Sequence, residues 1–412
     1  MSLSLELYRS RSRYLAAKAV GGRIPGALAG PIAPLRLVNR DEPRTPAAGW
    51  VRVRPRLAGI CGSDLATLSG QSSFYFSPLV SMPFVPGHEV VGELLDDVAP
   101  APDPGPDAPA SRRDGLAAGT RVVLDPVLSC GARGVGPCRW CAEGQRSRCD
   151  RVTVGHVSPG LQTGYCADTG GGWGRRLVAH RDQLHAIPDT LPDKRAVLVE
   201  PLACAVHSVR RAGIEPGQSV VVVGAGTVGL FTLLALRSLT QAASVTVVAK
   251  HDRQRELAAA FGATDVVAPD RAVNALRRSS RAFLLHPERG TDFLLGGVDV
   301  AFEATGASSG LDLALRTVRA GGRVVLAGLP GARADLTPVW YRELELVGAY
   351  ASGQSPERVS DFDTAIAMAT EAPLDGVVSA TYPLQRWREA IDHAFAAGRL
   401  GALKVTFAPQ EE

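Results

Sequence analysis

The sequence predicts an α/β protein that contains a doubly wound parallel sheet of six strands and a second domain. Two observations support this fold class. Short valine-rich runs recur along residues 219–350, and helical stretches separate most of them. The first run, SVVVV, leads directly into a glycine-rich turn and an apolar helix, FTLLALRSL. The predicted strands are residues 219–223, 244–249, 265–268, 298–304, 323–328 and 344–350.

The glycine-rich turn predicts a binding site for a dinucleotide. Gly224, Gly226 and Gly229 form the pattern G-x-G-x-x-G between a predicted buried strand and a predicted helix. The first glycine permits the tight turn, the second lets the backbone approach a pyrophosphate, and the third lets helix and strand pack closely. The helix start, with Thr227 and Val228, then directs N–H groups at the anion. The alternative is a glycine-rich corner that binds nothing, and the flanking strand and helix argue against it.

Length and composition indicate two globular domains with no nucleic-acid or membrane partner. The chain has 412 residues, of which 45% are hydrophobic and 21% charged, and its net charge is +4. The arginines are scattered rather than gathered into one basic stripe. No run of about eighteen apolar residues is present, and charges interrupt the N-terminal segment where a signal peptide needs an apolar stretch. We therefore expect a cytoplasmic protein.

The first two hundred residues and the last sixty supply the second domain. Residues 1–35 carry Pro and Gly interruptions and are assigned only as an extension. Residues 98–118 are rich in Pro, Ala and Asp, and we expect an exposed mobile insertion there. The predicted strands are residues 35–39, 50–60, 90–95, 120–126 and 403–407, and a helix is predicted within 197–213. Residues 360–370 form an amphipathic stretch.

Four cysteines within twenty residues predict a structural zinc site. Cys130, Cys138, Cys141 and Cys149 lie in a segment bounded by Gly and Pro, at about residues 130–149. Such a lobe cannot bury enough apolar surface to hold itself together, whereas four thiolates around one Zn²⁺ would fix it. The alternative is a set of reduced or partly demetallated thiols, which the central C-x-x-C pattern disfavours.

A second ligand set points to catalysis. Cys61, His88 and Glu200 lie at or near predicted strand ends and a helix start. A thiolate, an imidazole and a carboxylate can hold a catalytic Zn²⁺ and leave its fourth position for water or substrate. Each residue alone also has a structural explanation: a core cysteine, a hydrogen-bonding histidine or a carboxylate at a helix N-terminus.

Taken in order, these motifs resemble the zinc-dependent medium-chain alcohol and polyol dehydrogenases. The resemblance rests on GICGSD, PGHEVVGEL, the four-cysteine lobe, VEPLACAVHS, VVVVGAGTVGL and EATG, and it runs from about residue 35 to the C-terminus. It implies a GroES-like, mainly-β catalytic domain (residues 1–205 and 350–412) and a Rossmann domain (206–349). The Glu-Pro-Leu form is similar to the sorbitol and threonine dehydrogenase branch. Such enzymes are homodimers or homotetramers that transfer a hydride between a nicotinamide coenzyme and an alcohol or carbonyl substrate.

The resemblance also assigns two catalytic residues. Ser63 matches the hydroxyl that takes the alcohol proton, and Glu89 matches the carboxylate beside the zinc, either a transient ligand or a neighbour of the ligands. Gly62 and Asp64 are interpreted as structural. Two other functions stay open: reduction of an activated C=C bond, which would have little need of Ser63, and nucleotide binding without catalysis.

Two departures from the family pattern concern the metal sites. Relatives often carry a histidine five positions after the zinc cysteine, where this chain has Ala66, so the proton must leave by another route. Seven residues instead of two separate the first pair of lobe cysteines, which makes Cys130 the least secure ligand. Cys204 lies near Glu200 in sequence and could replace it as third ligand.

The third departure favours NADP(H) over NAD(H). In NAD enzymes of this fold an acidic residue ends the second strand and binds the adenosine ribose. That position is Ala249, followed by Lys250, His251 and Arg253, which can pair with a 2′-phosphate. The alternative is that these charges are merely solvated and that Asp252 reaches the ribose of NAD. The other expected coenzyme-binding residues are Gly224, Gly226, Thr227, Val228, Gly229, Thr305 and Gly328.

Overall fold

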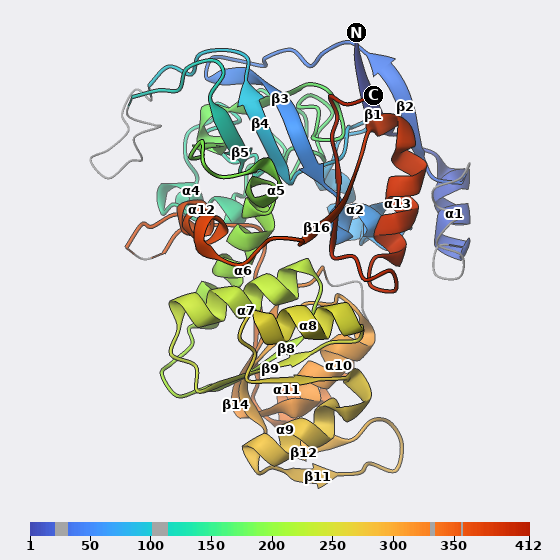
Figure 1. The fold of residues 1–412 in the computed structure, drawn as a ribbon, viewed down its shortest axis with the longest axis vertical. Coiled ribbons are helices and arrows are strands. Elements are labelled where there is room, and N and C mark those ends of the chain that lie inside the picture. Colours follow the sequence, from blue (N-terminus) through green and yellow to red (C-terminus); the bar gives the residue numbers. More distant parts are fainter. Residues whose placement is uncertain (21–31, 101–113, 330–333, 356) are drawn as a thin grey trace. The chain divides into compact units, whose positions relative to one another are not determined.

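The computed structural model of the chain describes residues 1–20, 32–100, 114–329, 334–355 and 357–412 and divides into two compact units (Figure 1). Unit 1 comprises Met1–Glu200 and Ser352–Glu412, and unit 2 comprises Pro201–Ala351. The predicted α/β class with a six-stranded parallel sheet is confirmed. Most of the predicted insertion, residues 101–113, lies outside the described residues.

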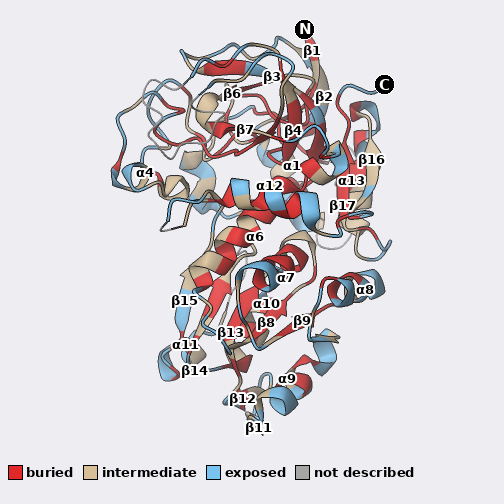
Figure 2. Ribbon diagram, turned by 60° about the vertical axis from the view of Figure 1, so that its left-hand side comes forward, coloured by how far each residue is buried: buried red, intermediate tan, exposed pale blue. Residues whose placement is uncertain are grey.

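Unit 2 is a doubly wound sheet in the order β10-β9-β8-β13-β14-β15, with every neighbouring pair parallel. Its central strands are runs of valine and other apolar residues because helices cover both faces of such a sheet, and Figure 2 shows them buried. The strands are β8 (Ser219–Val223), β9 (Ser244–Val248), β10 (Asp265–Val267), β13 (Val298–Glu303), β14 (Val318–Leu326) and β15 (Glu345–Gly348). The short strands β11 (Phe283–Leu285) and β12 (Phe293–Leu295) pair separately.

The helices of unit 2 follow its strands in the expected alternation. The chain winds outward from β8 to β10 and then returns to β13, on the other side of β8. This reversal places the carboxyl ends of β8 and β13 side by side, which is where sheets of this kind bind ligands. The helical elements are α6 (Val199–Ala212), α7 (Thr227–Leu239), α8 (Asp252–Ala260), η5 (Pro269–Arg271), α9 (Ala272–Ser280), α10 (Ser308–Thr317) and α11 (Thr337–Tyr341).

Unit 1 contains a mixed sheet in the order β16-β17-β3-β4-β5-β7, with β6 beside β3. The last strand, β17, pairs antiparallel with β3 and thereby joins the C-terminal segment to the first half of the unit. Its apolar core includes Trp173, which donates from Nε1 to the Gly59 carbonyl at 3.1 Å and packs on Phe407. The strands are β3 (Trp50–Gly59), β4 (Val90–Leu94), β5 (Arg121–Leu124), β6 (Leu177–His180), β7 (Leu184–Ala186), β16 (Val378–Tyr382) and β17 (Lys404–Phe407).

Short helices connect these strands. Cys61 is the N-cap residue of α2, which starts immediately after β3, so the end of β3 fixes the position of the thiol. The helical elements of unit 1 are α1 (Arg11–Val20), α2 (Gly62–Leu68), η2 (Phe74–Leu79), α4 (Arg139–Ala142), η3 (Arg146–Arg148), η4 (Arg181–Gln183), α5 (Asp193–Ala196), α12 (Asp361–Glu371), η6 (Leu384–Arg386) and α13 (Trp387–Ala396).

The N-terminal extension is more regular than the sequence suggested. Strand β1 (Ser2–Leu7) pairs antiparallel with β2 (Leu35–Arg40), and α1 lies between them in sequence. The amide of Leu5 donates to the Trp173 carbonyl at 2.8 Å and that of Leu7 to the Phe84 carbonyl at 2.9 Å. Leu5 and Leu7 are buried by these neighbours from later in the chain, which is why the local sequence gave little indication of a strand.

Candidate functional site

A buried cluster of three candidate ligands lies in unit 1. Cys61 caps α2 after β3, and His88 and Glu89 directly precede β4, the neighbour of β3 in the sheet. One sulfur, one ring nitrogen and one carboxylate oxygen of these residues all lie within 4.8 Å of one another. His88 is 4% exposed and Glu89 1% exposed. This combination of donors is one that Zn²⁺ accepts in catalytic sites.

An unsatisfied pair beside the cluster supports the fit to a metal. Asp64 Oδ2 accepts a hydrogen bond from the Cys61 amide at 3.0 Å, but Oδ1 lies 3.6 Å from His88 Nδ1. Neither Oδ1 nor Nδ1 has a hydrogen-bond partner in the described part of the chain. A histidine that ligates a metal through one ring nitrogen commonly turns the other towards a carboxylate. Burial alone would lower the pKa of His88, but Asp64, Cys61 and Glu200 raise it well above its ordinary value.

A lysine from the C-terminal strand neutralises Glu89. Lys404 Nζ lies 2.6 and 2.7 Å from the two carboxylate oxygens of Glu89 and 3.4 Å from the Ile60 carbonyl. Burial would lower the pKa of Lys404, but the charge of Glu89 outweighs it and the pKa is raised. Gly59 makes room for this pair, because a Cβ at that position would lie 1.8 Å from Glu89 Oε2. The Glu89 carboxylate has lone pairs left for a metal ion.

The third predicted ligand, Glu200, lies near the cluster but outside the set of atoms within 4.8 Å. It is 8% exposed in the first turn of α6, and its charge raises the pKa of both His88 and Lys404. The structure therefore brings two predicted ligands, Cys61 and His88, together with Glu89. Cys204 lies one turn further along the same helix.

Ser63 is half-buried in the first turn of α2, close to Cys61. On the same helix, Thr67 Oγ1 lies 3.3 Å from Tyr165 Oη. Burial of the Tyr165 hydroxyl and the charge of Asp64 raise the pKa of Tyr165 well above its ordinary value, and the hydrogen bond with Thr67 offsets only part of this rise. Sequence reasoning missed Tyr165, since a single tyrosine in a loop carries no signal.

The four lobe cysteines come together as a separate cluster, Cys130 included. Their sulfur atoms lie within 4.8 Å of one another, and Cys130 Sγ lies 3.6 Å from Cys149 Sγ. Tetrahedral zinc thiolates place sulfurs about 3.8 Å apart, so the residues fit a zinc ion. The Cys138 amide also donates to Cys130 Sγ at 3.3 Å. Burial raises the pKa of Cys149 to about 11, so a metal must displace its proton.

The glycine-rich turn of unit 2 has the geometry that a pyrophosphate requires. Gly224 has a φ of 101°, and a Cβ there would lie 2.5 Å from Thr305 Cγ2. Gly226 is the N-cap of α7, and no side chain caps that end of the helix. A Cβ on Gly229 would lie 1.9 Å from the Gly224 carbonyl oxygen. The N–H groups of the first turn of α7, which includes Thr227 and Val228, are thus available to an anion.

A buried carboxylate organises the loop after β13. Glu303 is 3% exposed, and its carboxylate accepts hydrogen bonds from the Thr305 amide at 2.8 Å and from the Gly306 amide at 3.1 Å. Its carbonyl accepts from the Gly328 amide at 2.8 Å. Glu303 therefore fixes both loops that carry the predicted coenzyme residues Thr305 and Gly328. The sequence showed EATG as a motif but did not reveal this role.

The end of β9 carries cations and no buried carboxylate. Ala249 is fully buried, Lys250 is exposed, and His251 is the N-cap of α8. Arg253 pairs with Glu256 at 3.0 Å on the exposed face of α8. Asp252, the alternative ribose ligand, forms an ion pair with Arg255, and its side chain is 86% exposed.

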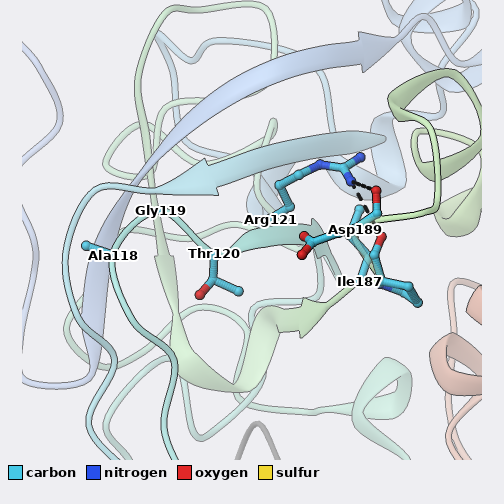
Figure 3. Close-up of a pocket in the computed structure, with 7 residues that line it drawn as sticks. Ala118, Gly119, Thr120, Arg121, Ile187 and Asp189 are labelled. Carbon is cyan, nitrogen blue, oxygen red and sulfur yellow. Dashed lines mark hydrogen bonds between the residues drawn. The ribbon is translucent and has the colours of Figure 1, made fainter.

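The open pocket of unit 1 contains none of these residues. This pocket of about 620 Å³ is lined by residues 118–121 and 187–189, where the Arg121 guanidinium donates to the Asp189 carbonyl at 3.2 Å (Figure 3). The aromatic side chains of residues 74–84 differ in their burial. Phe74 and Tyr75 are 66% and 78% exposed, whereas Phe84 belongs to the core. Among the described residues, no helix is long and apolar enough to cross a membrane.

Known proteins resemble the chain in both units. Residues 47–189 match the family described as alcohol dehydrogenase GroES-like domain, and residues 227–392 match zinc-binding dehydrogenase. L-idonate 5-dehydrogenase of Vitis vinifera is 29% identical over 302 residues, 73% of each chain. Sorbitol dehydrogenase of Bacillus subtilis is 29% identical over 298 residues, 72% of this chain and 70% of that protein. A zinc-binding dehydrogenase from Sinorhizobium meliloti 1021, solved with NADP, superposes with a TM-score of 0.68 at 25% identity over 99% of this chain and 100% of that one.

Proposed function

The chain belongs to the zinc-dependent medium-chain alcohol and polyol dehydrogenases and is an NAD(P)-linked oxidoreductase of alcohols; from this premise we propose that Cys61, His88 and a carboxylate hold its catalytic zinc. The observation that carries the proposal is the buried cluster of Cys61, His88 and Glu89, with the unsatisfied Asp64–His88 pair beside it. Glu89 is the favoured carboxylate and Glu200 the alternative.

The mechanism assigns each side chain a task. When bound, zinc supplies a Lewis acid that lowers the pKa of the substrate hydroxyl, and the coenzyme supplies the hydride acceptor. Ser63 accepts the proton of the alcohol, and Asp64 holds the His88 ring in one orientation. Lys404 compensates the charge of Glu89, so that the cluster keeps less net negative charge in its buried surroundings.

Exchange of the cysteine tests this assignment. Cys61→Ser should lose one zinc equivalent and alcohol oxidation, whereas Cys204→Ser should keep both. Elemental analysis of protein purified without chelator gives the zinc content, and NAD(P)H absorbance gives the rate. Full zinc content and normal rates in Cys61→Ser would rule out this metal site. Comparison of Glu89→Gln with Glu200→Gln by the same analysis identifies the carboxylate ligand.

A second zinc ion in the lobe is also part of the proposal. Cys130, Cys138, Cys141 and Cys149 would hold it with no open position, which is typical of a structural site. The clustered thiolates would survive best in a reducing compartment, so we propose a cytoplasmic location.

We propose NADP(H) as the preferred coenzyme. Lys250 and His251 follow the buried Ala249 at the end of β9, and no carboxylate replaces them there to repel a 2′-phosphate. Arg253 is a weaker candidate because Glu256 already pairs with it. The NADP-bound relative from Sinorhizobium meliloti is consistent with this choice.

The proposed substrate is a small polyol or its carbonyl form, because the relatives at 29% identity are named for L-idonate and sorbitol. Assaying a panel of polyols and ketoses with both coenzymes tests this. A response only to simple alcohols would exclude a polyol substrate.

We also propose a homodimer that forms along β15. This strand ends the described sheet, and large apolar side chains on and near it are exposed: Trp340 (81%), Tyr341 (65%), Tyr350 (42%) and Leu346 (40%). A second copy of the chain could pair with the strand and cover these side chains. Sedimentation should show a dimer that Leu346→Lys weakens, and a monomeric wild-type protein would refute it.

A further inference from the structure

The N-terminal extension contacts the segment that connects two candidate zinc ligands. Cys61 caps α2 and His88 lies two residues before β4, so residues 70–87 run from the end of one ligand-bearing element to the other ligand. Helix α1 packs on the start of this connection. The helix lies outside residues 47–189, which match the GroES-like family. The contact is therefore a feature of this chain that the family match does not explain.

Tyr14 makes the central contact between α1 and this segment. Its Oη donates to the Gly70 carbonyl at 3.2 Å, and its ring centroid lies 5.4 Å from that of Phe74. Lys18, one turn further along α1, places Nζ 5.8 Å from the centroid of the same ring, within the range of a cation–π attraction. Gly70 permits this approach, because its φ is 67° and a Cβ there would lie 3.2 Å from both Tyr14 Cε2 and Lys18 Cβ. The helix thus holds the backbone at Gly70 and the side chain of Phe74.

Helix α1 is itself attached to unit 1 by other contacts. Ala17 is 1% exposed, and Arg13 Nη1 donates to the Ala33 carbonyl at 3.2 Å. Ala33 is 1% exposed and lies just before β2, the strand that pairs with β1. The helix therefore has an anchor that does not involve residues 70–75.

The start of the connection lies close to the metal cluster. Thr67 Oγ1, in the last turn of α2, lies 3.0 Å from Ser72 Oγ and 3.3 Å from Tyr165 Oη. The ring centroid of Tyr165 lies 6.0 Å from that of His88. Only the side chains of Thr67 and Tyr165 thus separate Ser72 from a candidate ligand.

Two exposed aromatic side chains follow Ser72 on this segment. Phe74 and Tyr75 are 66% and 78% exposed. Hydrophobic and aromatic side chains predominate in the walls of small-molecule sites. A segment that is already held in place also binds a ligand more tightly, because ordering it during binding would cost affinity.

We propose that α1 holds residues 70–75 in place as one wall of the alcohol-binding site beside the metal cluster, so that Tyr14 sets the affinity for the substrate. The proposal rests on the proposed function, oxidation of an alcohol at the site of Cys61 and His88. Tyr14 acts through Gly70 and Phe74 and does not touch the substrate. It is therefore a positioning residue, whose loss changes substrate binding rather than the chemical step.

Removal of the Tyr14 side chain tests the proposal. Tyr14→Ala should raise KM for the best substrate of the polyol panel roughly threefold to tenfold, because residues 70–75 must then be ordered during binding. The value of kcat should change less than about twofold, since loss of substrate binding alone leaves kcat unaltered. Tyr14→Phe keeps the ring on Phe74 and loses only the hydrogen bond to Gly70, so it should raise KM less. Zinc content and the Kd for coenzyme should be unchanged in both variants.

The next residue on α1 supplies the matched control. Leu15 is 64% exposed, and Leu15→Ala shortens a side chain of the same helix without touching the contacts of Tyr14. Leu15→Ala should therefore keep the wild-type KM. An equal rise in KM in Leu15→Ala and Tyr14→Ala would show that the contact of Tyr14 with residues 70–75 is not the cause, and would overturn the proposal.

Hydrogen exchange gives a readout that does not depend on turnover. The amides of residues 70–72 donate to the carbonyls of Ala66 and Thr67. In substrate-free Tyr14→Ala the peptide that covers residues 69–76 should exchange faster, while peptides from β3 and β4 should exchange as in the wild type. Unchanged exchange in this peptide, or faster exchange throughout unit 1 with a lower Tm, would overturn the proposal.

The outcomes also distinguish this proposal from the proposed function. If Cys61→Ser loses zinc and alcohol oxidation while Tyr14→Ala keeps the wild-type KM, the role of Tyr14 is wrong and the proposed function stands. If the wild-type enzyme oxidises no alcohol with either coenzyme, the proposed function fails and the role of Tyr14 in substrate binding fails with it.

Discussion

Lys250 is the exposed cation closest in sequence to the end of β9. An ion pair between its ammonium group and a 2′-phosphate should contribute on the order of 1–3 kcal/mol. Lys250→Ala should therefore raise the Kd for NADP several-fold or more and leave the Kd for NAD nearly unchanged, as measured by fluorescence titration. Lys194→Ala, an exposed lysine in unit 1, is the control. Equal losses for both coenzymes would refute the NADP assignment.

Ser63 is the residue whose loss best separates alcohol chemistry from C=C reduction. Ser63→Ala should depress alcohol oxidation by roughly 10²-fold while zinc stays bound, because the first proton acceptor is gone. Thr67→Ser provides a control that leaves the same helix intact. Near-normal carbonyl reduction with full zinc content would contradict the mechanism and favour a C=C reductase.

Residues in local motifs could be predicted from the sequence, and residues brought in from elsewhere could not. Cys61, His88 and the turn glycines stand in short recognisable patterns, and the family and activity they indicated are confirmed. Lys404 lies 315 positions after Glu89 in the sequence. It contacts Glu89 only because β17, which carries it, pairs with β3. Tyr165 likewise reaches Thr67 across 98 positions. The one feature of the sequence that pointed to the ion pair of Lys404 was a lysine inside the apolar run LKVTF.

At the scale of elements, Asp299 links two strands of the parallel sheet. Its carboxylate on β13 accepts hydrogen bonds from the amide and the hydroxyl of Ser219 on β8, both at 2.7 Å, and from Arg319 Nε at 2.7 Å. Burial would raise the pKa of Asp299, but Arg319 and Ser219 outweigh it and lower the pKa below 3.8. The charged form is therefore favoured by folding.

Asp299→Asn should lower the free energy of unfolding by about 1–2 kcal/mol at pH 7, measured by urea denaturation. Because the folded-state pKa is depressed, this contribution is fully present above the unfolded value of about 3.8 and is lost as the pH falls through the folded-state pKa. The difference between variant and wild type should thus be constant from about pH 5 to 8 and shrink below about pH 4. Exposed Asp270→Asn should show no such difference. A difference that grows on acidification would contradict this account.

The central strands β8 and β9 of the parallel sheet were predictable because they are buried on both faces and read as continuous apolar runs. Strand β1 was not predicted, since its partners lie near residues 35–40, 84 and 173. The short pair β11 and β12 was missed for a related reason: three-residue strands carry too few side chains to show a period.

For the whole molecule, two ligand clusters of different composition predict two zinc ions per chain. Elemental analysis should give a stoichiometry near two. Cys138→Ser should remove the lobe zinc and lower Tm, because the lobe has little apolar core of its own. Cys61→Ser should remove the other zinc and leave Tm much less affected. A wild-type stoichiometry near one would eliminate one of the two sites, and the two variants identify which.

Unit 2 is one uninterrupted stretch, Pro201–Ala351, inserted between the two parts of unit 1. A single continuous gene segment therefore encodes the glycine-rich turn and Lys250, while Cys61, His88 and Lys404 are encoded outside it. Recombination at two points could exchange coenzyme preference between relatives without altering a metal ligand. Coenzyme preference and substrate chemistry can therefore evolve independently of each other. Chimaeras of two relatives, joined at these two positions, would re-create such an exchange.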